Sequence, residues 1–266
     1  MASALETSLG HHRAWSLAAL ALLVALAWGW LLSGAGTGMR PAFCIVPPIG
    51  HGAAMPGMAA ADPETWSPGR LALTFAMWWT MMVAMMLPSA APMILLFARA
   101  AAVQTASRPA TAAFLGGYLA VWGVFSLLAT ALQTLLDRAG LIAAMTIGVQ
   151  GRWLAAAILL AAGLYQFGAV KDVCLRHCRK PAQFLARHYR PGWSGALRMG
   201  LRHGAFCLGC CGVLMALLFV GGVMNLAWIA LLTLLVAAEK LLPHGRAVGL
   251  AAGWACLAGA AALLLT

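Results

Sequence analysis

Residues 71–97 read LALTFAMWWTMMVAMMLPSAAPMILLF, a run without a single charged side chain. A helix that spans the hydrocarbon core of a bilayer needs about 20 mostly apolar residues, so this run is long enough to cross a membrane. Basic residues flank it, with Arg70 before it and Arg99 after it. Ten consecutive residues of the run contain five methionines, at the start of the stretch MWWTMMVAMMLP at residues 77–88. The stretch predicts a spanning helix that is unusually rich in thioether sulfur.

The composition extends this interpretation to the whole chain. Of 266 residues, 63% are hydrophobic and 9% are charged, which is typical of a membrane protein. An all-α polytopic membrane protein is therefore predicted, with a bundle of about seven transmembrane helices forming one transmembrane helical domain over residues 1–266. The expected spans are residues 14–33, 71–97, 111–136, 153–170, 203–222, 225–242 and 247–265. The apolar piece at 141–149 is too short to span and is expected to be interfacial or re-entrant.

The distribution of charge predicts the topology. The net charge is +11, and eight of the 17 basic residues fall within residues 171–202. An excess of Lys and Arg marks the cytoplasmic side, which places the N-terminus inside, the C-terminus outside and residues 34–70 in an outer loop. A short surface helix is expected at 182–189, between two prolines. The predicted location is the inner (plasma) membrane, and lipid headgroups account for the basic balance without a nucleic-acid partner.

The methionines of residues 77–88 fall on a common helix face. Met77, Met81 and Met85 are spaced i, i+4 and i+8, and Met82 and Met86 lie beside them. Thioethers favour Cu(I), so the stripe is a candidate path for a soft metal ion. The alternative is that the methionines are a polarizable packing surface between helices.

Cysteine and histidine gather in two further segments, CLRHC at 174–178 and HGAFCLGCC at 203–211. Within each segment the side chains are spaced by helical turns, and both segments are expected at the cytoplasmic ends of their spans, where they can face each other. The cytosol is reducing, so free thiols are available as ligands for Cu(I) or Zn(II). The predicted inner-face ligands are Cys174, His177, Cys178, His203, Cys207, Cys210 and Cys211.

Two further groups of candidates are weaker in pattern. His51, Met55 and Met58 in the outer loop are expected to capture a metal ion outside the membrane. Glu239 is one of only six acidic residues, and ionisable groups in membrane helices are often functional, so it is a candidate accessory ligand. A salt bridge to Lys240 or to a loop arginine, or exposure at the interface, would also explain it, and Lys240 itself is expected to reach the headgroups. Signatures of catalysis are absent from the sequence, and the protein is not expected to be an enzyme.

Several of these segments resemble a known family. MWWTMMVAMMLPSAAP, KDVCLRHCRKP and GLRHGAFCLGCCGVLMALLFVGGVMNLAW followed by AEKLLP are similar to domain of unknown function 2182, a family of predicted metal-binding integral membrane proteins. The resemblance covers residues 71–243. It implies a polytopic membrane fold, with a metal site at the methionines of residues 77–86 and at the inner-face cysteines and histidines.

The sequence thus favours an integral membrane protein that binds and moves or delivers a soft metal ion. Copper as Cu(I) is the expected metal and zinc the alternative, with the lipid bilayer and a membrane or metallochaperone protein as partners. A rival hypothesis is a non-transporting membrane subunit or assembly factor, whose Met-rich and Trp-rich faces pack against partner helices and in which Gly200 and Gly204 fit such a face. A weaker third hypothesis is a redox protein that uses Cys207 and Cys210 as a dithiol pair.

Overall fold

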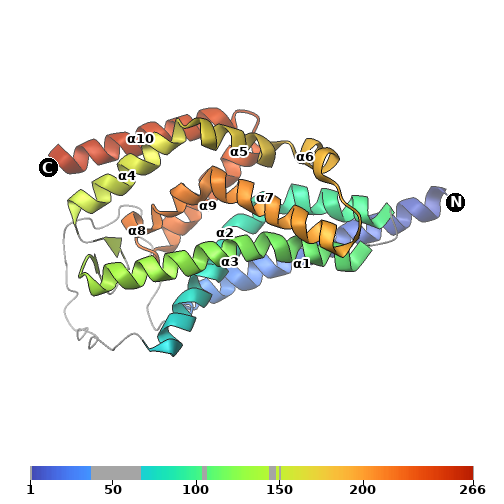
Figure 1. Ribbon diagram of the computed structural model, residues 1–266, viewed down its shortest axis with the longest axis horizontal. Helices are drawn as coiled ribbons and strands as arrows, with labels where there is room; N and C mark the ends of the chain where they lie inside the picture. The colour runs from blue at the N-terminus through green and yellow to red at the C-terminus, as the bar shows by residue number, and fades with distance from the viewer. Residues whose placement is uncertain (1, 37–66, 104–106, 144–147, 150, 266) are drawn as a thin grey trace.

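A computed structural model describes residues 2–36, 67–103, 107–143, 148–149 and 151–265, and 87% of the structure is helical (Figure 1). The predicted all-α class is confirmed. In the segment expected to be interfacial or re-entrant, two short strands pair in antiparallel fashion, with Ile142 opposite Val149. The elements are α1 (Ala2–Leu32), α2 (Pro68–Val103), α3 (Ser107–Arg138), β1 (Ile142–Ala143), β2 (Gly148–Val149), α4 (Arg152–Gln166), α5 (Ala169–Arg179), α6 (Pro181–His188), α7 (Gly192–Met215), α8 (Leu218–Gly221), α9 (Leu226–Leu241) and α10 (Gly245–Leu265).

Fewer helices qualify as membrane spans than the sequence suggested. Within the described residues, five are long and apolar enough, and α4 with α5, bent by 64° at their junction, makes a sixth if the pair counts as one span. The predicted span at 225–242 is helical, but α9 has 16 residues, whereas a full span needs about 20. The count of seven and its topology therefore remain predictions. The five qualifying spans are Ala14–Leu32, Pro68–Ala102, Pro109–Arg138, Gly192–Gly221 and Gly245–Leu265.

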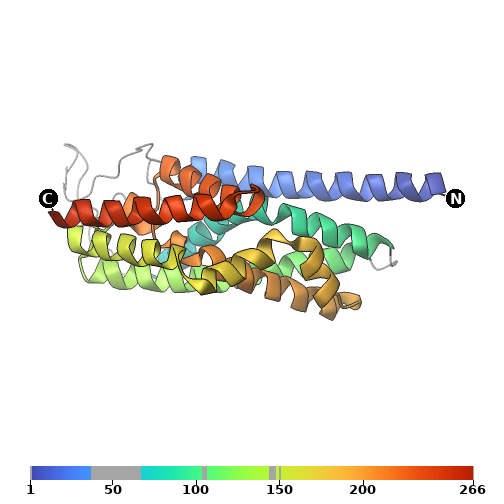
Figure 2. The same ribbon diagram turned by 90° about the horizontal axis from the view of Figure 1, so that it is seen from above.

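The helices pack lengthwise into an elongated bundle. α2 packs against α1 and α3, and α3 against α7, while α4 pairs with α10 along the upper edge in Figure 1. α9 contacts both α2 and α10, and so connects the group of α1, α2, α3 and α7 with the pair of α4 and α10. The two termini lie at opposite ends of the long axis (Figure 1). Figure 2 shows α1 along one edge, where it extends beyond the other helices at the N-terminal end.

Glycines bring α3 and α7 into direct backbone contact. A side chain at Gly200 would meet the carbonyl oxygen of Phe114, and one at Gly204 would meet Val121. Gly200 and Gly204 thus form a helix-packing face, as the rival hypothesis supposed, but the helix that covers them is α3 of the same chain. The close contact fixes the position of α7, which carries three of the candidate cysteines.

The basic segment 171–202 consists largely of helices rather than of an open loop. A short helix is present where one was predicted, as α6, and it is anchored by Phe184, which is buried. Its location on the membrane surface remains a prediction. Lys171, expected in the cytoplasmic loop, is instead fully buried in the first turn of α5. The reason is that α5 continues almost directly from α4, so its first turn still lies within the bundle.

The topology can be tested with reporter fusions at Ala182, an exposed residue of α6, and at the C-terminus. If α9 and α10 both cross the membrane, the two reporters are expected on opposite sides, with Ala182 in the cytoplasm. Paired alkaline phosphatase and fluorescent protein fusions would measure this. Reporters on the same side would mean that α9 or α10 does not cross and that the count of seven is wrong.

Candidate metal centre

Sulfur atoms from three helices converge in the interior of the bundle. The thiol of Cys210 on α7 lies 3.8 Å from the thiol of Cys178 on α5, and Cys211 lies 3.6 Å from the sulfur of Met86 on α2. Cys207 is one helical turn away from Cys210 and Cys211 on the same face of α7. We call these five residues the sulfur cluster. The predicted approach of the two cysteine segments is confirmed for Cys178.

The thiols of the cluster are organised around one backbone carbonyl. Cys210 and Cys211 both donate to the carbonyl oxygen of Cys207, at 3.1 and 3.0 Å. The sulfur of Cys207 in turn lies 3.2 Å from the hydroxyl of Tyr118, on α3. Each of these three sulfurs is therefore oriented by a hydrogen-bond partner, and all three are buried.

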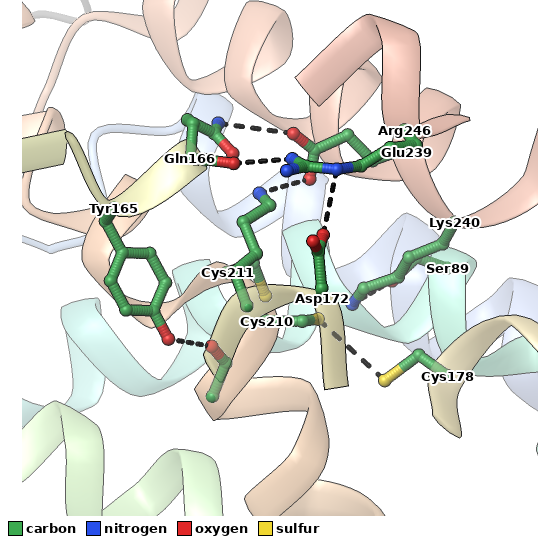
Figure 3. Close-up of polar contacts among 12 residues, drawn as sticks. Ser89, Tyr165, Gln166, Asp172, Cys178, Cys210, Cys211, Glu239, Lys240 and Arg246 are labelled. Carbon is green, nitrogen blue, oxygen red and sulfur yellow. Dashed lines mark hydrogen bonds and ion pairs between the residues drawn. The ribbon is translucent and has the colours of Figure 1, made fainter. Parts of the chain in front are cut away.

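A lysine is directed into the cluster, which the sequence did not predict. The ammonium group of Lys240 donates to the sulfur of Cys207 and to the hydroxyl of Ser89, both at 3.1 Å. Figure 3 shows Lys240 and Ser89 together beside the cysteines. The expectation that Lys240 reaches the headgroups is wrong, because its side chain is buried between α2 and α7. A positive charge next to a thiol favours its thiolate form, which is the form that binds metal.

The methionine stripe is internal. Each of its five members has an exposed fraction of 1% or less, so the stripe is no surface for a partner helix. This removes one premise of the rival hypothesis. Among the five methionines, Met86 contacts a cysteine sulfur, that of Cys211. The stripe consists of Met77, Met81, Met82, Met85 and Met86.

Two predicted ligands of α5 lie at the edge of the cluster or beyond it. Cys174 is partly exposed, and its sulfur packs so closely on Gly209 that a side chain there would collide with it. The ring of His177 stacks on Phe206, with 4.0 Å between ring centroids, and its Nδ1 pairs with the carbonyl oxygen of Val173 at 2.8 Å. His177 lines a separate cavity between α5 and α6, so the structure does not bring it together with the sulfurs.

His203 is buried among aromatic rings on α7. Its ring lies 5.7 Å from that of Tyr118 and 5.4 Å from that of Phe184, measured between centroids. The side chain is 2% exposed, and its Nδ1 has no hydrogen-bond partner. A buried nitrogen without a partner is unfavourable by about 1–3 kcal/mol, which is a reason to expect a ligand there.

The geometry suits an ion of low coordination number. Across the described parts of the chain, no three His, Cys, Asp or Glu side chains form a group that could hold a metal ion. One pair of cysteines could nevertheless share a metal ion. Two sulfurs that each bind an ion at about 2.3 Å lie at most about 4.6 Å apart, and the sulfurs of Cys178 and Cys210 lie within that distance. Thiolates together with a thioether are the donors that favour Cu(I).

Glu239 takes part in a buried ion pair rather than in the sulfur cluster. Its carboxylate accepts from the ammonium of Lys171 at 2.7 Å. It also accepts from the amide of Gln166 at 3.2 Å (Figure 3). The prediction that Glu239 forms a salt bridge with Lys240 or with a loop arginine is wrong. Sequence reasoning missed Lys171 because it stands at the start of the basic segment. The only signal for its burial is the apolar run that leads directly into it.

Three residues of the outer loop are predicted to capture a metal ion outside the membrane. His51, Met55 and Met58 lie outside the described residues. Their role remains a prediction from the sequence.

The fold and the cluster together define a helical protein that has several helices long and apolar enough to cross a membrane and a buried site rich in thiol and thioether sulfur. Residues 75–263 match the profile of the family described as PpoB2, copper chaperone, and the chain belongs to this family. The predicted link to copper is thereby confirmed, although the match does not carry the name domain of unknown function 2182. No curated protein and no solved structure matches the chain.

Proposed function

We propose that this protein binds Cu(I) at the sulfur cluster, within the plasma membrane, and passes the ion to an acceptor. The observation that carries the proposal is the convergence of thiols from α5 and α7 with a thioether from α2 in one buried place. Membership of a copper chaperone family supports copper as the cargo. The acceptor or donor is a membrane protein or a metallochaperone.

The donor chemistry supports Cu(I) over Zn(II). Zinc sites in proteins are mostly tetrahedral and use thiolate, imidazole and carboxylate ligands. Here the imidazole of His177 stacks on Phe206 and the carboxylate of Glu239 pairs with Lys171, whereas a thioether contacts Cys211. A soft ion that accepts two or three sulfur ligands fits this set better.

The methionine stripe provides the route to the cluster. Met77, Met81 and Met85 follow one another every four residues of α2, a rise of about 6 Å per step. Met86 then contacts the cluster itself. Thioethers bind Cu(I) more weakly than thiolates, so the ion can exchange along the stripe and is retained at the cluster. A conduction path must bind its ion weakly enough to release it.

Changing Met77, Met81, Met82 and Met85 together to Leu tests the route. The swap keeps side-chain volume, so each change costs less than about 1.5 kcal/mol of stability, and Met86 is left in the cluster. Copper flux into proteoliposomes that contain a Cu(I) chelator is expected to fall at least about tenfold, the effect of about 1.4 kcal/mol lost at one step. Radioactive copper counting measures it.

The control is a variant in which Met199, Met215 and Met224, which are also buried but lie outside the stripe, are changed to Leu. It is expected to keep the wild-type flux. Wild-type flux in the stripe variant, at normal protein levels, would refute the route. It would favour a non-transporting subunit or assembly factor, in which the methionines only pack the bundle.

A further inference from the structure

A cavity of about 240 Å³ opens onto the sulfur cluster between α2, α5, α7 and α9. Pockets for drug-sized ligands measure about 300–1,000 Å³, so this one suits a smaller molecule. Two cysteines of the cluster form part of its wall, and a molecule inside it would therefore reach a bound ion. We call this cavity the vestibule. The lining residues that matter here are Ser89, Cys178, Arg179, His203, Cys207 and Lys240.

Within the described chain, the vestibule is lined by two cationic side chains, Lys240 and Arg179, and by no carboxylate. The carboxylate next to Lys240 in sequence, Glu239, is already paired with Lys171. Lys240 is left with a hydroxyl and a thiol as its hydrogen-bond partners. When Cu(I) takes the Cys207 thiolate as a ligand, that negative charge is shared with the ion. Lys240 and Arg179 then face the cavity with no carboxylate among its described lining residues, so the loaded vestibule favours an anionic ligand.

Two further groups are placed to hold such a ligand. Nδ1 of His203, buried and without a hydrogen-bond partner, belongs to a side chain that lines the vestibule. The guanidinium of Arg179 is fixed by bonds of 2.8 and 2.6 Å to the carbonyl oxygens of Leu242 and Pro243. A fixed cation at a cavity wall attracts anions without having to be ordered first.

We infer that the vestibule binds a small anionic thiol, which exchanges Cu(I) with the sulfur cluster and whose negative charge is recognised by Lys240 and Arg179. The inference rests on the proposed function. In the exchange, a bond from Cu(I) to the thiolate of Cys178 or Cys207 breaks and a bond to the incoming sulfur forms. The incoming thiol gives up its proton, the released cysteine takes one up, and copper remains Cu(I) throughout.

The test compares three small thiols that differ in charge as acceptors of Cu(I) from the loaded protein. They are 3-mercaptopropionate (anionic), 2-mercaptoethanol (neutral) and cysteamine (cationic). The rate at which each thiol removes Cu(I) from the protein is divided by the rate at which it removes Cu(I) from a bis-cysteine reference peptide. Wild type is expected to favour the anionic over the cationic thiol by at least about tenfold, the lower end of electrostatic steering in a charged cleft. High salt should reduce this preference.

Variants assign the preference to the vestibule. Lys240→Met is expected to lower the preference in part, because Arg179 remains, and Lys240→Arg to keep most of it. The double variant Lys240→Met, Arg179→Met is expected to lower the preference to the value of the peptide. Arg198→Met is the matched control, because Arg198 is exposed on α7 and does not line the vestibule. It removes the same charge and should change nothing. If Lys240→Met does not fold, the salt dependence of the wild-type preference decides.

Three results would overturn the inference: a wild-type preference equal to that of the peptide, an unchanged preference in folded Lys240→Met, or release of Cu(I) only to a cysteine-bearing protein. Each leaves the proposed function standing, provided that wild type binds Cu(I). Failure of wild type to bind Cu(I) in the loading step would instead refute the proposed function itself.

Discussion

The double variant Cys178→Ser, Cys210→Ser is expected to lose Cu(I) binding almost completely. These two thiols come from different helices and lie 3.8 Å apart, close enough to share one ion. A hydroxyl is a harder donor than a thiolate and does not ionise near neutral pH, so neither serine replaces the lost ligand. Affinity should fall by more than the roughly 10–100-fold that loss of one outer-shell partner costs. Competition with a chromophoric Cu(I) chelator measures it.

Cys256→Ser is the matched control for this experiment. Cys256 is also buried, but it lies on α10 and outside the sulfur cluster. It should keep wild-type affinity. Wild-type affinity in the Cys178/Cys210 double variant would mean that these thiols only pack the bundle. Cu(I) would then have to bind at another site in the chain.

Lys171→Met is expected to destabilise the protein by about 3–5 kcal/mol, because it leaves the carboxylate of Glu239 buried without its ionic partner. Both side chains of this pair are 1% exposed or less, at a distance of 2.7 Å. Adding Glu239→Gln removes the uncompensated charge, so the double variant should recover most of the loss. Unfolding in mixed micelles, followed by circular dichroism, measures the free energies.

The second ion pair of the same region provides the comparison. Arg246 and Asp172 are joined at 2.9 Å, but their side chains are 33% and 36% exposed. Water and salt weaken such a pair, so Asp172→Asn should cost no more than about 1 kcal/mol. An equal loss in Lys171→Met and Asp172→Asn would show that burial does not determine the strength of the first pair.

Local spacing carried most of what the sequence predicted correctly. Turns of 3.6 residues place Cys207, Cys210 and Cys211 on one face of α7, and prolines mark the ends of α6. These features depend on one helix at a time. The approach of Cys178 was predicted only because its segment and that of Cys207 were assigned the same depth in the membrane.

The partners of charged side chains could not be predicted in this way. Glu239 and Lys240 are neighbours in the chain, yet successive residues of a helix point about 100° apart, and each meets a different helix. Glu239 meets Lys171 on α5, whereas Lys240 meets Cys207 on α7. Which helix stands on which side of α9 is a property of the bundle. The sequence of α9 does not contain it.

The backbone contact between Gly200 and Phe114 has a consequence for the entropy of metal binding. Three of the cluster's four thiols are carried by α7, whose position against α3 is set by that contact, and their sulfurs are already oriented by hydrogen bonds. Ordering a rotamer-rich side chain on binding costs about 0.5–1.5 kcal/mol, and here much of that loss has occurred during folding. The cluster is thus preorganised, so a soft ion bound there as proposed would gain its bonds to sulfur with little further loss of side-chain freedom.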